Sequence, residues 1–135
     1  MDMILGRSFP DQPVYISSLK AGEGLVTIRG KVSQLKIQDL NDRKMMLLLF
    51  TVTDHSASVL CKAFLGYRRF SKMDREDLSP VTDEERKTVL DKVNEIKQCH
   101  FVTVRGEYDF DSRLQGLSIL IRDLAKVGEG NDHEL

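Results

Sequence analysis

The segment VTIRGKV (Val26–Val32) alternates apolar and polar residues and carries a glycine near its end. A period of two is typical of a strand that has one face in the core. Gly30 stands on the apolar face, where the missing side chain favours a sharp bend in the sheet. Further along, the apolar positions change phase at Leu35 and Ile37, which predicts a bulge in a strand over residues 25–40.

Four more strands and one helix are predicted from the residues that follow. Thr82 and Glu85 have the spacing of a helix-capping box, and the apolar residues behind them predict an amphipathic helix over residues 83–98. Polar residues at 41–43 and 109–115 predict hairpin turns. Alternating apolar residues predict strands over residues 44–53, 58–65, 101–108 and 117–124.

This order of elements decides the expected fold class. Three strands, a helix and a final hairpin are the order of the oligonucleotide-binding (OB) fold, a five-stranded β-barrel. We therefore expect a mainly all-β protein with its helix between the third and fourth strands. Another small β-barrel or an α+β sandwich is the alternative. The barrel is expected over residues 25–127, after an N-terminal arm of residues 1–24 and before a C-terminal tail of residues 128–135.

Composition is that of an ordinary soluble protein of one domain. The 135 residues include 20 Lys and Arg against 21 Asp and Glu, which excludes a disordered acidic chain and a strongly basic nucleic-acid coat. The longest apolar run, Met45–Phe50, is far shorter than the roughly 20 residues of a membrane helix. No secretion signal is recognisable. We therefore expect a cytoplasmic protein with no membrane partner and with reduced cysteines.

No residue pattern indicates catalysis. Asp109 and Asp111 in one loop and Asp54 in another are interpreted as turn residues, because polymerase and nuclease sites need clustered carboxylates that hold two metal ions. His55 is also interpreted as a turn residue and not as a general base, because it lies in the same polar turn next to Asp54. The sequence has no CxxC or HExxH metal motif. We expect no catalytic residue, metal, cofactor or small-molecule substrate in this chain.

Three segments together resemble a known domain. They are VTIRGKV (26–32), LLFTVTDHSASVLCKAF (48–64) and VTVRGEYDFDSRLQGLSILIRDL (102–124). In this order they are similar to the OB-fold domain near the N-terminal end of PolC-type DNA polymerase III alpha subunits. The resemblance implies a segment of a larger replicative DNA-directed DNA polymerase, a nucleotidyltransferase with a 3′–5′ exonuclease. The tail at residues 128–135 would then lead to the next domain of that protein.

Binding of single-stranded DNA is the first functional interpretation. OB barrels bind nucleic acid on the outer face of their second and third strands, between two hairpin loops. Binding of single strands combines basic side chains with aromatic rings on which bases stack. Phe64 is the expected stacking ring. The full set of expected nucleic-acid-binding residues is Arg29, Lys31, Arg43, Lys44, Lys62, Phe64, Arg68, Arg69 and Arg113.

The same outer face favours a second interpretation. Leu47, Leu49 and Leu60 are expected there beside Phe64, and exposed apolar patches tend to mark interfaces. Aliphatic side chains also stack poorly on bases. The alternative is therefore a structural or protein-interaction module, whose outer face packs against the helix over residues 83–98, a neighbouring polymerase domain or a partner protein.

Overall fold

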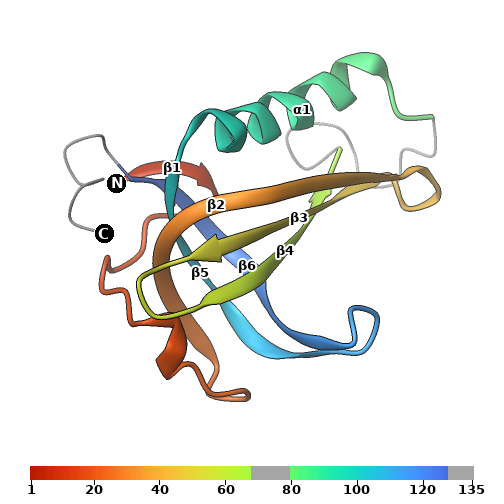
Figure 1. The fold of residues 1–135 in the computed structure, drawn as a ribbon. Helices are drawn as coiled ribbons and strands as arrows, with labels where there is room; N and C mark the ends of the chain where they lie inside the picture. The colour runs from red at the N-terminus through yellow and green to blue at the C-terminus, as the bar shows by residue number, and fades with distance from the viewer. Residues whose placement is uncertain (68–79, 128–135) are drawn as a thin grey trace.

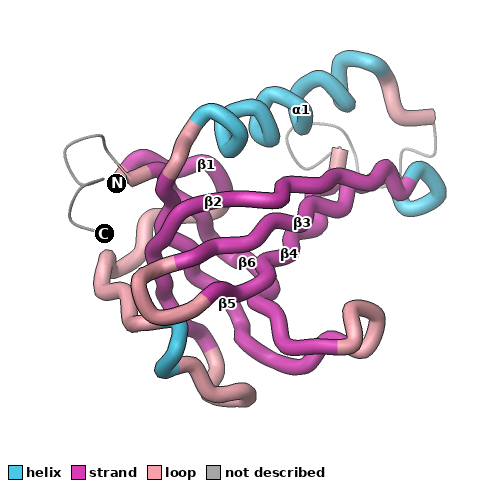
Figure 2. Tube along the Cα trace, viewed as in Figure 1, coloured by secondary structure: helices cyan, strands magenta, loops and turns pink. Residues whose placement is uncertain are grey.

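The computed structural model describes residues 1–67 and 80–127, which form a β-barrel with one helix (Figures 1 and 2). Helix α1 spans Asp83–Gln98, and two short 3-10 helices, η1 (Ile16–Ser18) and η2 (Asn41–Arg43), lie in loops. The expected order of five strands and a helix is confirmed, and one further strand precedes them. The strands are β1 (Asp2–Leu5), β2 (Leu25–Leu40), β3 (Met45–Thr53), β4 (Ser58–Gly66), β5 (Phe101–Asp111) and β6 (Gly116–Lys126).

Strand β2 belongs to both sides of the barrel because its two halves pair with different neighbours. Residues 25–31 run antiparallel to β5, and residues 31–40 run antiparallel to β3. Gly30 lies where the halves meet, and a Cβ atom there would be 2.4 Å from the carbonyl oxygen of Thr53. The expected bulge follows between Ser33 and Lys36, with Gln34 at a φ of 54°. The glycine and the bulge together let one strand serve both sides of the barrel.

The remaining pairings complete a five-stranded OB barrel from β2 to β6. Strand β4 runs antiparallel to β3 on one side and parallel to β6 on the other, with Lys62 opposite Leu120. Strands β5 and β6 form an antiparallel hairpin. The sheet therefore closes on itself through the β5–β6 pairing, as the fold requires.

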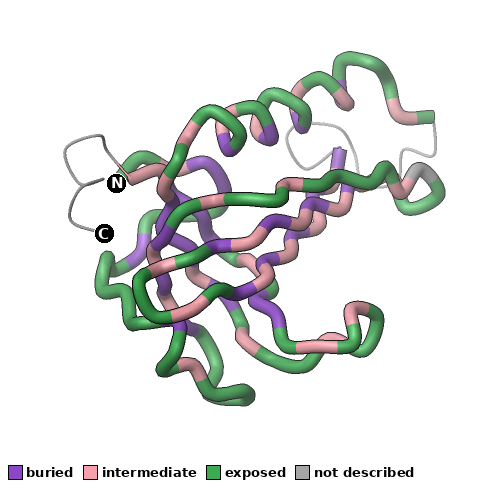
Figure 3. Tube along the Cα trace, in the orientation of Figure 1, coloured by how far each residue is buried: buried purple, intermediate pink, exposed green. Residues whose placement is uncertain are grey.

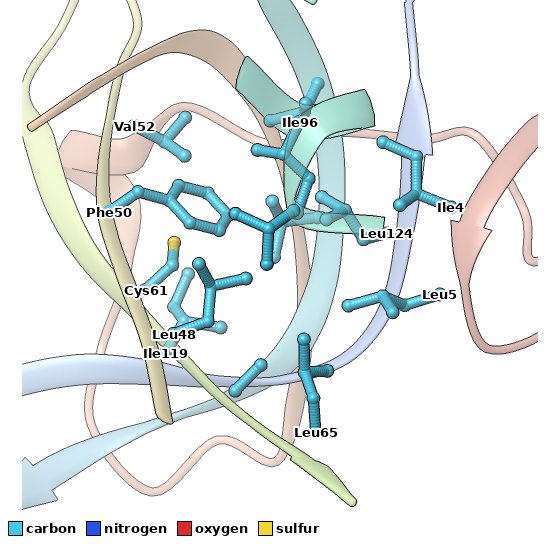
Figure 4. Packing of buried hydrophobic residues seen from close by; sticks show 14 of the residues in the cluster. Ile4, Leu5, Leu48, Phe50, Val52, Cys61, Leu65, Ile96, Ile119 and Leu124 are labelled. Carbon is cyan, nitrogen blue, oxygen red and sulfur yellow. The ribbon is translucent and has the colours of Figure 1, made fainter. Parts of the chain in front are cut away.

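The barrel interior and α1 share one hydrophobic core (Figure 4). Phe50 and Leu48 of β3 point inward toward Ile96 of α1 and Leu124 of β6, and all four are fully buried. The predicted capping box starts the helix: the backbone N–H of Glu85 donates to Thr82 Oγ1 at 3.1 Å. In the described part of the chain, no helix has the length and apolar character that crossing a lipid bilayer requires.

The N-terminal residues contribute a strand that the sequence analysis did not predict. Strand β1 runs antiparallel to β6, with Asp2 opposite Lys126 and Leu5 opposite Leu124. Ile4 and Leu5 are buried in the common core. Residues 1–24 therefore pack on the barrel in part, and their separation from it as an arm stays a prediction. The expected C-terminal tail at residues 128–135 lies outside the described residues.

Candidate nucleic-acid interface

The outer face of β3 and β4 carries the row of residues expected from the alternation. Phe64 lies opposite Leu47, Lys62 opposite Leu49, and Leu60 opposite Thr51. All these side chains are half-buried, whereas their neighbours in sequence point into the core. Helix α1 does not cover this face, since its buried side chains belong to the barrel core and it lies along β2 in Figure 1. Helix α1 therefore leaves this face uncovered.

Two hairpins project on the same side of the molecule and border this face (Figure 1). The β2–β3 hairpin ends in η2, where Arg43 is exposed, and the β5–β6 hairpin carries exposed Arg113. Neither guanidinium group pairs with any residue of the described ranges. Much of the second hairpin is coloured as exposed in Figure 3, and Phe110, near its tip, is 60% exposed. Each hairpin therefore presents a cation to solvent, and the second adds an aromatic ring.

Lys62, at the centre of the face, is engaged within the protein. Its Nζ atom forms an ion pair with the carboxylate of Asp111 on β5 and lies 5.3 Å from the centre of the Phe64 ring. The side chains of Lys62 and Asp111 are only 14% and 9% exposed. The hydrogen bond from Lys62, with two more from the backbone N–H groups of Arg113 and Leu114, holds the pKa of Asp111 below its ordinary value. The charge of Lys62 is therefore already compensated.

A cavity of about 330 Å³ lies between Lys62 and the β5–β6 hairpin, and its charges are mixed. Three carboxylates, those of Glu107, Asp109 and Asp111, line it together with the cations Lys62 and Arg113. Asp111 neutralises Lys62, which leaves two carboxylates against one arginine. The cavity itself is therefore a poor site for a phosphate group.

The structure places the other expected residues apart from the centre of the face. Arg29 pairs with Asp11 and donates from Nε to Thr103 Oγ1 at 3.2 Å, so its half-buried side chain ties β2 to β5. Lys31 is exposed at the position where β2 changes partners. Lys44 is half-buried at the start of β3, with a φ of 52°. The remaining two expected cations, Arg68 and Arg69, lie outside the described residues.

Two arginines beside Phe64 were missed by the sequence analysis. Arg7, just after β1, and Arg122, on β6, are exposed and line a groove of about 550 Å³ together with Phe64. No residue of the described ranges forms an ion pair or hydrogen bond with either guanidinium group. The three residues come from distant parts of the sequence, and no local pattern links them. Phe110, which was assigned to a polar loop, was also missed.

Asp54, one of the acids considered for catalysis, stabilises the loop structure around it. Its carboxylate accepts hydrogen bonds from the backbone N–H groups of Ile16 at 2.8 Å, Ser56 at 2.7 Å and Ala57 at 3.0 Å. Partial burial raises the pKa of Asp54, but hydrogen bonds from Ser56, Ile16 and Ala57 outweigh it, and the pKa lies below its ordinary value. Across residues 1–67 and 80–127, no group of three or more His, Cys, Asp and Glu side chains is arranged to hold a metal ion.

Similarity to known proteins covers nearly the whole chain. The DNA polymerase III PolC-type of Clostridium perfringens is 30% identical over 124 residues, which are 92% of this chain and 7% of that protein. This chain is similar to one segment of PolC-type DNA polymerase III. The PolC-type enzyme of Caldanaerobacter subterraneus subsp. tengcongensis is 26% identical over 125 residues, 93% of the chain and again 7% of the relative. The resemblance inferred from the three sequence segments is therefore confirmed.

The fold of this PolC-like chain also recurs in a solved structure. RecG bound to a three-way DNA junction superposes with a TM-score of 0.54 at 18% sequence identity, over 93% of this chain and 14% of RecG. At this identity the likeness supports the OB fold alone. No protein-family model matches the chain. The PolC-like chain spans about 7% of the length of its curated relatives.

Proposed function

We propose that this chain is a non-catalytic module that binds single-stranded DNA in the context of a PolC-type DNA polymerase. The observation that carries the proposal is the outer face of β3 and β4, which α1 does not cover, between two hairpins that present Arg43 and Arg113 to solvent. OB barrels bind nucleic acid on this face. The similarity to a PolC-type segment supports DNA replication as the setting.

The mechanism is neutralisation of phosphates combined with stacking of bases. Arg43 and Arg113 stand on opposite borders of the face, so a strand that crosses it passes both cations. Each phosphate contact releases bound counterions, and the affinity for single strands falls with a log–log slope of about −0.7 per contact as salt rises. Phe64 on β4 and Phe110 on the hairpin offer rings to the bases, each such contact being worth about 1–3 kcal/mol.

We assign the polymerase and nuclease chemistry of such an enzyme to parts of it outside this segment. Polymerase and nuclease sites hold two metal ions with clustered carboxylates. Two of the acids considered above are instead engaged elsewhere: Asp54 holds a turn, and Asp111 forms an ion pair with Lys62. The role proposed for the module is to hold template DNA near a catalytic domain without any cofactor of its own.

Fluorescence anisotropy with a labelled oligo-dT tests the proposal at low and moderate salt. The charge-reversed double variant Arg43→Glu/Arg113→Glu is expected to weaken binding at least tenfold, given two lost contacts with slopes of about 0.7 each. The matched control is Lys20→Glu/Lys97→Glu, which changes net charge equally at exposed sites away from the hairpins. Equal losses in both variants, or no salt-sensitive binding by the unmodified protein at tens of micromolar, contradict the proposal.

A protein-docking role is the second candidate, and the outer leucines favour it. Leu47, Leu49 and Leu60 form an apolar strip across β3 and β4, and Leu120 on the adjacent strand β6 is 43% exposed. Such a strip suits a neighbouring polymerase domain. Leu49→Lys separates the candidates: it should abolish association with a PolC-type catalytic segment added in trans, measured by calorimetry, and leave or strengthen the affinity for oligo-dT.

A further inference from the structure

The groove beside Phe64 lies outside the face that the two hairpins border. It opens between the end of β1, the end of β4 and the middle of β6, and encloses about 550 Å³. Its floor is apolar, with Leu5, Ala63 and Ile121, and its rim carries Arg7 and Arg122. An aromatic ring, an apolar floor and two cations are the components of a site for one nucleotide.

Backbone geometry brings the two arginines to one place. Leu5 pairs with Leu124, and the chain then turns at Gly6 with a φ of 76°. A Cβ atom on Gly6 would lie 2.6 Å from the carbonyl oxygen of Arg122, so only glycine permits this approach. The backbone N–H of the next residue, Arg7, donates to the Oδ1 atom of Asp123 at 2.9 Å. The turn is thus fixed at both of its residues, which places Arg7 beside Arg122.

The electrostatics of the groove differ from those of the cavity at the hairpin. The acid next to the groove is Asp123, which is 4% exposed and pairs with Arg105 at 3.6 Å while accepting from the Arg7 backbone. Its charge is therefore compensated and withdrawn from solvent. The side chains of Arg7 and Arg122 remain exposed, and their guanidinium groups are engaged with no residue of the described ranges. The groove is therefore the more favourable of the two for an anionic ligand.

We propose that this groove binds one nucleotide unit of a single strand, with its phosphate between Arg7 and Arg122 and its base against Phe64. The proposal rests on the single-strand binding proposed above and adds a subsite to it. Phe64 connects the two, since it lies on the outer face of β4 and also lines the groove. A strand that crosses the face between the two hairpins therefore continues past Phe64 into the groove beside β1.

Anisotropy titrations with labelled oligo-dT at several salt concentrations test this subsite. Arg7→Gln/Arg122→Gln is expected to weaken binding about tenfold and to reduce the log–log salt slope by about 1.4, or 0.7 per cation. Lys20→Gln/Lys97→Gln is the matched control and should leave both quantities unchanged. Because all four side chains are exposed, thermal melts should match the unmodified protein and exclude a folding defect.

The possible outcomes separate this proposal from the one on which it rests. If the groove variant binds like the control while Arg43→Glu/Arg113→Glu loses affinity, the subsite is refuted and the hairpin-bordered face stands. If the unmodified protein does not bind oligo-dT, both are refuted. Photocrosslinking gives an independent measurement. An oligonucleotide with 5-iodouracil should crosslink to Phe64, and crosslinks to other residues with none to Phe64 would overturn the subsite.

Discussion

The ammonium group of Lys62 on β4 is paired with the carboxylate of Asp111 on β5, 49 residues away in sequence. The pair lies at the centre of the face proposed to bind DNA. A phosphate that approaches Lys62 must therefore compete with a carboxylate already in place. In the proposed complex with DNA, Asp111 would therefore restrain binding as well as stabilise the fold.

Removal of that carboxylate should strengthen DNA binding. We expect Asp111→Asn to tighten oligo-dT binding about threefold to tenfold at low salt, because one more cation contributes a slope of about 0.7. The same substitution should lower the melting temperature. Anisotropy and thermal melts measure both effects. Glu23→Gln, an equal charge change in an exposed loop, should do neither, and adding Lys62→Met to Asp111→Asn should cancel the gain.

Tyr67 ties the end of β4 to the β2–β3 hairpin and to α1. Its buried hydroxyl group donates to Asp39 Oδ1 at 2.7 Å, and the guanidinium carbon of Arg86 lies 5.1 Å from the centre of its ring. Burial, with the hydrogen bond and charge of Asp39, raises the pKa of Tyr67 to about 12. We expect Tyr67→Phe to reduce the free energy of unfolding by about 1 kcal/mol, measured by urea denaturation at neutral pH.

The same shift predicts how stability depends on alkaline pH. The folded pKa of Tyr67 lies above its ordinary value of 10.0, so the neutral tyrosine is favoured in the folded state. Its contribution is complete below pH 10 and is lost as pH rises toward about 12. Tyr67→Phe should remove this part of the alkaline destabilisation. Tyr15→Phe, at an exposed site, should retain it, and identical pH profiles for the two variants would contradict the assignment.

Asp54 fastens η1 to the β3–β4 loop. We expect Asp54→Ala to reduce the free energy of unfolding by at least about 2 kcal/mol, because even one hydrogen bond to a charged group is worth about 1.5–3 kcal/mol. The Ile16 amide should also exchange faster with deuterium. The folded pKa is below the ordinary 3.8, so the contribution is present at neutral pH and disappears as pH falls through the folded value. Asp42→Ala, at an exposed residue of η2, is the control.

Gly30 and Gly116 should respond in opposite ways to alanine. A Cβ atom on Gly30 would lie 2.4 Å from the Thr53 carbonyl oxygen, which is backbone and cannot move aside. We expect Gly30→Ala to cost about 3 kcal/mol through overpacking. Gly116 has its nearest such neighbour at 4.0 Å, so Gly116→Ala should stay within about 0.5 kcal/mol. Chemical denaturation measures both, and equal costs would show that the close approach is not the cause.

The barrel was predictable from the sequence because its signals are local. The alternation through Met46, Leu48, Phe50 and Val52 is readable along one strand, and the capping box at Thr82 needs four consecutive residues. Strand β1 was missed because four residues are too few to show a period. Its existence depends on a partner, β6, that lies more than 100 positions further along the chain.

The candidate site was less predictable, since its properties arise from contacts between distant segments. Arg29 and Lys62 look like free cations in sequence, yet the fold gives each a carboxylate partner, Asp11 and Asp111. Conversely, Arg7 and Arg122 form a candidate site only because β1 pairs with β6 and brings them to Phe64. Side-chain charge can be read from one residue, whereas its availability depends on tertiary neighbours.

The antiparallel pairing of β1 with β6 has a consequence for any longer polypeptide that contains this barrel. Asp2 lies directly opposite Lys126, so the chain enters and leaves the barrel at one point. A barrel attached in this way would be joined to its neighbours on one side only. Swinging about the attachment point would move Arg7, which lies five residues from Asp2, much less than the tips of the two hairpins. The groove would then stay near the rest of the larger protein, while the tips of the hairpins would move over the widest range.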